Sequence, residues 1–159
     1  MSAWRPDDSL LDRGAKGEVK GARRVSDVLR QRGIRAANQI VTSRDTGVAG
    51  AQRDLKRTGM PAGVEQWQLP LVTPLDNVLV FISRMKPGAA VPAHAHRVWV
   101  FRVVISGTLK YARKTLKPGD WMLVPPGKVY AIQAGSGGCT ILYAHCAPTG
   151  PPGPPGPGG

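Results

Sequence analysis

The sequence has few cysteines and no long apolar run. Only two of its 159 residues are cysteine, Cys139 and Cys146, too few for a scaffold held together by disulfides. They lie seven residues apart in one expected strand, so we expect them on opposite faces and reduced. No stretch reaches the roughly 20 apolar residues of a membrane span, and the N-terminus has no signal-peptide core. We therefore expect a soluble, cytoplasmic protein with no membrane partner.

Acidic residues are also scarce. The chain has 10 Asp and Glu against 22 Lys and Arg, a formal net charge of +12. Residues 1–63 hold thirteen basic and seven acidic residues, and the rest of the chain holds nine and three, so each part contributes +6. Because this charge is not confined to a detachable tail, nucleic acid is a disfavoured partner, whereas an anionic small molecule is an expected one.

Composition predicts three zones: a basic N-terminal extension over residues 1–63, a barrel over residues 64–146, and a Pro/Gly-rich tail over residues 147–159. Ser26 is predicted to cap a helix whose apolar positions run from Val28 to Val41, across Gly33. The rest of the extension is expected to be flexible or peripherally packed. The tail has eleven Pro or Gly in thirteen residues, which predicts a disordered, polyproline-like segment.

The central zone alternates short apolar runs with Gly and Pro turns and shows no helical periodicity between them. Strands at intervals of about ten residues indicate an all-β antiparallel sandwich or barrel. The expected strands are residues 77–85, 94–106, 108–113, 121–124, 129–133 and 139–146.

Two spaced motifs lie within this zone. The first consists of Gly88, His94, His96 and Gly107, and the second of Gly119, Pro125, Gly127 and Tyr130. In order and spacing the pair resembles the two signatures of the cupin superfamily. The resemblance implies a cupin-type double-stranded β-helix, a jelly-roll barrel with its site inside.

The resemblance also implies a divalent metal, which the family holds with two His and a Glu from the first motif and a His from the second. Here Val100 stands at the Glu position and Tyr130 at the second-motif His position. His94 and His96, two apart in a strand, project from one face and are predicted ligands of Fe, Mn, Ni or Zn, unless no metal is bound. Tyr130 is a further candidate ligand. His145 is either a ligand or a surface or dimer-contact residue.

The parity set by the two histidines continues inward through Val98, Val100, Arg102 and Val104. A buried guanidinium needs a carboxylate or an anionic ligand, so Arg102 is predicted to bind substrate, unless a register shift exposes it. Val100 and Trp121 are assigned to the same substrate site, with packing as the alternative for Trp121.

The opposite parity of the same strand carries an apolar ridge. Trp99, Phe101, Val103 and Ile105 would face outward there, which is unusual in solvent. A homodimer is therefore expected.

Three functions remain open. The first is a cupin metalloenzyme of the oxygenase or the lyase/isomerase class, acting on a carbonyl-, enolate- or acid-bearing small molecule, with His94, His96 and Tyr130 catalytic. The second is a metal-free cyclase or isomerase of a polyketide-like substrate, with a histidine as base and Tyr130 as acid. The third is a non-catalytic ligand-sensing or binding module. In any of them, capping of the barrel mouth and extension of a sheet by strand exchange are the alternatives to a flexible or peripherally packed N-terminal extension.

Overall fold

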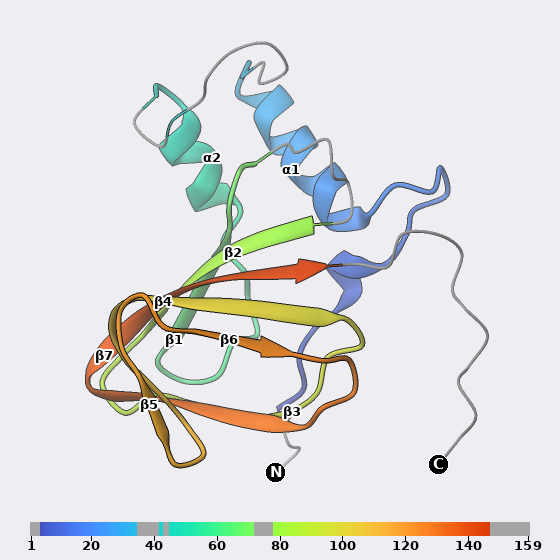
Figure 1. The fold of residues 1–159 in the computed structure, drawn as a ribbon. Helices are drawn as coiled ribbons and strands as arrows, with labels where there is room; N and C mark the ends of the chain where they lie inside the picture. Colours follow the sequence, from blue (N-terminus) through green and yellow to red (C-terminus); the bar gives the residue numbers. More distant parts are fainter. Residues whose placement is uncertain (1–3, 35–41, 43–44, 72–77, 147–159) are drawn as a thin grey trace, which may run out of the picture.

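The fold is known from a computed structural model, which describes residues 4–34, 42, 45–71 and 78–146. A short helical stretch of three elements precedes the strands: η1 (Ser9–Leu11), α1 (Lys20–Gln31) and α2 (Val48–Asp54). Seven strands follow: β1 (Val64–Gln68), β2 (Val78–Met85), β3 (Ala90–His94), β4 (Trp99–Tyr111), β5 (Lys114–Leu116), β6 (Trp121–Val124) and β7 (Tyr130–Cys146). In Figure 1 the two helices lie together at one end of the rolled sheet.

The strands form one antiparallel sheet in the order β1-β2-β7-β4-β5, with β3 paired to β7 and β6 paired to β4. The longest strand, β7, pairs with three others. Its first residues pair with β3, its last residues pair with β2, and β4 runs along much of its length. The predicted all-β fold is therefore confirmed. Residues 147–159, where we predicted a disordered tail, lie outside the described residues.

Several predicted strand boundaries were wrong. Residues 94–106 do not form one strand, because the chain bends after His94 and β4 begins at Trp99. The predicted strands 129–133 and 139–146 are one strand, because the glycine-rich link between them is an irregular part of the ladder and not a turn. There Gly107 and Gly138 both have positive φ, and a Cβ on Gly107 would collide with the carbonyl oxygen of Gly138. Only glycine permits this close crossing.

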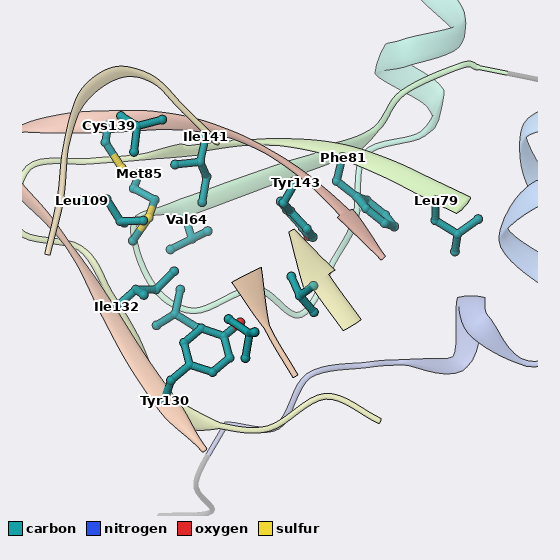
Figure 2. Packing of buried hydrophobic residues seen from close by; sticks show 14 of the residues in the cluster. Val64, Leu79, Phe81, Met85, Leu109, Tyr130, Ile132, Cys139, Ile141 and Tyr143 are labelled. Atoms are coloured by element: carbon teal, nitrogen blue, oxygen red, sulfur yellow. The ribbon is translucent and has the colours of Figure 1, made fainter. Parts of the chain in front are cut away.

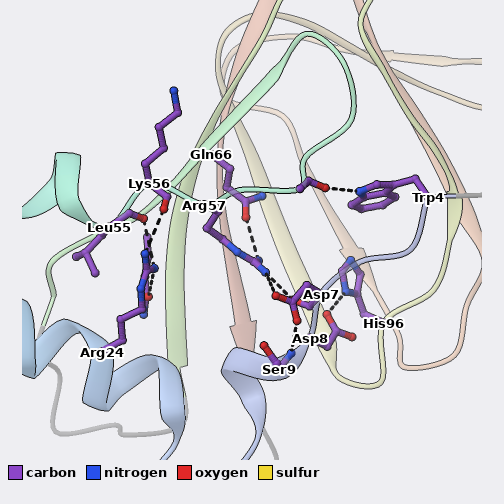
Figure 3. Close-up of polar contacts among 12 residues, drawn as sticks. Trp4, Asp7, Asp8, Ser9, Arg24, Leu55, Lys56, Arg57, Gln66 and His96 are labelled. Atoms are coloured by element: carbon purple, nitrogen blue, oxygen red, sulfur yellow. Dashed lines mark hydrogen bonds and ion pairs between the residues drawn. The ribbon is translucent and has the colours of Figure 1, made fainter.

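The N-terminal extension is packed more fully than expected. Helix α1 begins at Lys20, so Ser26 lies inside it and is not its cap, and residues 35–41 of the expected helix lie outside the described part of the chain. A small second core of Val25, Leu29, Ala51 and Leu55 joins α1 to the unpredicted α2. Arg24 donates to the backbone carbonyls of Leu55 and Lys56 at the end of α2, at 3.4 and 3.1 Å (Figure 3). Arg24 thus ties α1 to the chain that leaves α2.

The main core fills the roll (Figure 2). The predicted inward parity is confirmed by burial: Val98, Val100, Arg102 and Val104 are all at most 6% exposed. The two cysteines are free, Cys139 buried and Cys146 exposed, as expected from their odd spacing. Burial raises the pKa of the Cys139 thiol to about 11. Among the described residues, no helix is long and apolar enough to cross a membrane.

Candidate functional site

All three histidines of the chain meet in one cavity inside the roll. His94 ends β3, His96 follows in the bend before β4, and His145 lies on β7, and each is at most 6% exposed. The His96 ring centroid lies 5.0 Å from that of His94 and 4.7 Å from that of His145. The bend that interrupts the predicted strand thus still directs both histidines of the first motif into the interior.

Hydrogen bonds fix two of these rings in a definite orientation. The Nδ1 of His94 lies 2.7 Å from the carbonyl oxygen of Pro92, which can only accept, so Nδ1 carries the proton. The Nδ1 of His96 faces a carboxylate oxygen of Asp8 at 3.0 Å and donates to it in the same way. In a neutral ring the Nε2 atom then carries a lone pair. The Nε2 atoms of all three histidines are buried without a hydrogen-bond partner.

Burial keeps the imidazoles of His94 and His145 neutral. Desolvation lowers the pKa of His94 to about 4, and the neighbouring His96 and Arg102 lower it further against the opposing carbonyl of Pro92. Desolvation likewise holds the pKa of His145 well below 6.5, with His96 and Arg102 again adding to the effect. At neutral pH these rings are therefore unprotonated, which is the state that a metal ion requires of its ligands.

Asp8, from the N-terminal extension, is a fourth polar group beside the three histidines. The segment Trp4–Asp8, called here the N-terminal strap, lies over the histidines, where the Trp4 ring contacts His94 edge-on at 5.2 Å and its Nε1 donates to the Gly59 carbonyl oxygen. Arg57 donates to the Asp7 carbonyl oxygen at 2.6 Å and to the Gln66 side chain (Figure 3). These contacts hold the strap over the cavity and place Asp8 against His96. The strap thus occupies the position of a cap on the barrel mouth.

A buried arginine faces the same cavity from β4. Arg102 is 6% exposed, and its Nη2 donates to the Tyr130 hydroxyl oxygen at 2.6 Å. Its guanidinium carbon lies 4.6 Å from the Tyr143 ring centroid and 5.6 Å from that of Tyr130. Its Nε has no partner. Burial raises the pKa of Tyr143 to about 12, so this phenol stays neutral beside the guanidinium.

The structure brings five predicted site residues together and leaves two outside. His94, His96, His145 and Arg102 line the cavity, and the Tyr130 ring lies 4.4 Å from that of His94. Val100 faces inward but packs in the core without lining the cavity. Trp121 is not a cavity residue, because it pairs with Val103, whose side chain points outward, and it is 62% exposed. Its ring lies near Phe101 on the outer face of the sheet, in agreement with the packing alternative.

Sequence reasoning missed the contributions of the strap. Asp8, Trp4 and Arg57 all line the cavity, yet they lie in the zone predicted to be largely peripheral. Asp8 and His96 are 88 residues apart, so no local spacing connects them. The shortage of carboxylates in the barrel zone was the available signal, since a site without its usual Glu needs an acid from elsewhere.

The donor set fits a divalent metal. One oxygen of Asp8 and one nitrogen from each of His96 and His145 lie within 4.8 Å of one another. Imidazole nitrogen with carboxylate oxygen is a common ligand set for zinc and for iron, manganese or nickel. The three unpartnered Nε2 atoms give the same indication independently, because buried polar atoms are rarely left without partners.

Comparison with known families identifies the family of the chain. The sequence profile of the ChrR cupin-like domain family matches residues 45–148, about two thirds of the chain. The chain belongs to this cupin family. The cupin fold that the two motifs predicted is thereby confirmed, together with the N-terminal helices. A search of curated proteins gives no significant match.

Several solved cupin structures are similar to this one. A chain of the complex of Rhodobacter sphaeroides SigE with the anti-sigma ChrR is 18% identical and has a TM-score of 0.50, the match covering 80% of this chain and 76% of that one. The polyketide cyclase RemF from Streptomyces resistomycificus is 17% identical with a TM-score of 0.50, over 63% and 79%. KdgF from Halomonas sp. is 16% identical with a TM-score of 0.49, over 55% and 81%. At these identities the likeness concerns the fold alone, which enzymes and an anti-sigma factor share.

Proposed function

We propose that this cupin is a metal-dependent enzyme that binds one divalent ion and a small carbonyl- or acid-bearing molecule inside its barrel. His96, His145 and Asp8 hold the ion, and His94 faces it as a further donor. The observation that carries the proposal is the burial of all three histidines in one cavity, each with an unpartnered Nε2 atom.

The chain's own residues prepare the site in three ways. The Pro92 carbonyl fixes the proton of His94 on Nδ1 and leaves its Nε2 atom free, and the Asp8 carboxylate lies against the Nδ1 atom of His96, whose proton a bound ion would replace. Low pKa values keep His94 and His145 unprotonated. The strap, held by Trp4 and Arg57, limits the access of water to the cavity. A bound ion would supply Lewis-acid polarisation of a carbonyl oxygen, or oxygen chemistry if it is iron(II).

Metal titration of the chelator-treated protein tests this proposal. We expect one Zn²⁺, Mn²⁺, Ni²⁺ or Fe²⁺ ion to bind per chain in calorimetry and to raise Tm, because an ion that binds only the folded state stabilises it. Failure of all four ions to bind in this ratio would overturn the metal site. Turnover of a keto acid by the metal-free protein would instead favour proton transfer by His94 and Tyr130.

A ligand-sensing module is the second candidate function. It is supported by membership of the ChrR cupin-like family, which is named after an anti-sigma factor. The strap supports it as well, since Asp8 connects His96 to the residues that lead into α1. Asp12 strengthens this connection through ion pairs with Arg97 and Lys20. A metal-loaded protein that turns over none of a panel of keto acids and enols, but whose strap becomes protected from proteolysis when metal binds, would favour sensing over catalysis.

We propose further that the protein is a homodimer joined through its outer sheet face. Four large apolar side chains are exposed there on β4 and β6: Trp99, Ile105, Trp121 and Leu123. Because each chain carries +12, two copies repel unless they meet at an uncharged patch such as this one. Light scattering of the wild-type protein should give twice the mass of one chain, and the Ile105→Arg variant should give the mass of one chain. A monomeric wild-type protein would contradict the dimer.

A further inference from the structure

Arg102 is a charged cavity residue that the proposed metal site does not use. The residue is only 6% exposed. Among the residues that the structure describes, no carboxylate lies within the 4.0 Å of an ion pair to it. Its Nε remains without any hydrogen-bond partner.

Such a group is costly to bury unless something compensates its charge. The rings of Tyr143 and Tyr130 provide cation–π contact, which attracts the guanidinium but does not neutralise its charge. The three histidines cannot supply the compensation either, because they are neutral or proton donors towards other groups. An anion that enters the cavity would supply this compensation.

We propose that Arg102 and Tyr130 form a receptor for the carboxylate of a small organic acid with an apolar body. A guanidinium presents its N–H groups as a planar fork that matches the two oxygens of a carboxylate. The Tyr130 hydroxyl accepts a hydrogen bond from Nη2, so its own proton is left to donate to the same anion. Tyr130 thereby acts as a carboxylate-binding residue at the position where the cupin signature has a metal ligand.

The cavity wall beside Arg102 indicates the rest of the molecule. Met85, Val91, Ile132 and Ile141 form an apolar part of the cavity lining, next to polar residues that include Gln66 and Ser83. The apolar part suits a short hydrocarbon chain or ring. The inference deepens the proposed function, on which it rests for the reaction that the bound acid undergoes.

Paired ligands that differ only in charge test the receptor. We expect butyrate to bind the full-length protein, with or without metal, about 10- to 100-fold more tightly than butyramide in calorimetry. Arg102→Met should weaken butyrate by the same factor and leave butyramide unchanged. This variant should fold, because it replaces a buried cation with an apolar side chain of similar length. Arg84→Met is the control, since Arg84 is an exposed arginine on β2.

Each outcome decides one proposal. Equal affinity for butyrate and butyramide, unchanged butyrate binding in Arg102→Met, or tighter binding of inorganic phosphate would each overturn the receptor. If Arg102→Met does not fold, the wild-type comparison of the two ligands still decides. If the protein binds metal but does not distinguish butyrate from butyramide, the receptor is refuted and the metal site stands. If it prefers butyrate but takes up no metal, the metal site is refuted and the receptor stands.

Discussion

A His96→Ala variant is expected to bind Zn²⁺ or Mn²⁺ at least about 100-fold more weakly than the wild-type protein. His96 is the central group of the site, with ring contacts to both His94 and His145 and a hydrogen bond to Asp8. Its loss removes one ligand and also releases Asp8 from the position that the ring gives it. Calorimetric titration of the metal-free variant measures the effect.

Two further variants make this result specific. Asp8→Asn preserves the size of the side chain and should weaken metal binding by about 10- to 100-fold, the usual effect of losing a carboxylate that orients or binds. Asp27→Asn is its control, because Asp27 pairs with Arg30 on the solvent side of α1. Gln133→Ala, an exposed change on β7, controls for His96→Ala. Wild-type affinity in His96→Ala or in Asp8→Asn would remove the respective residue from the site.

The barrel could be predicted from sequence because its signals are local. Turn residues separate the strands, and the alternation from Val98 to Val104 predicts that Arg102 faces inward, in agreement with its burial. The errors arose where local and long-range preferences conflict. The glycines of residues 135–138 resemble a turn, yet Gly135 and Gly138 lie where β7 approaches Thr108 and Met85 too closely for a Cβ atom.

The site was only partly predictable for a related reason. Spacing alone identified His94 and His96, and strand parity left both faces open for His145. Nothing local could identify Asp8, because its approach to His96 depends on how the extension packs against the finished barrel. Trp121 was misplaced because aromatic character says nothing about which face of a sheet a residue occupies; its pairing with Val103 decides that.

The metal-free protein is expected to lose stability steeply between pH 6.5 and about pH 4. His94, with a pKa of about 4, and His145, with a pKa well below 6.5, remain neutral in the folded state throughout most of this window. In the unfolded chain the same side chains have a pKa of 6.5 and take up protons as the pH falls. The unfolded state thus binds more protons than the folded one, so the free energy of unfolding decreases with falling pH.

Each such histidine contributes up to about 1.4 kcal/mol per pH unit once the pH is below 6.5. Two of them remove several kcal/mol across two pH units, a large part of the roughly 5–15 kcal/mol that stabilises a typical domain.

Urea unfolding of metal-free protein at pH 7, 6 and 5 measures this slope above the range in which surface carboxylates titrate. His145→Gln should roughly halve the slope, because it removes one of the two buried bases. A flat profile for the wild-type protein would mean that the folded state accepts the protons, and hence that water reaches the imidazoles freely.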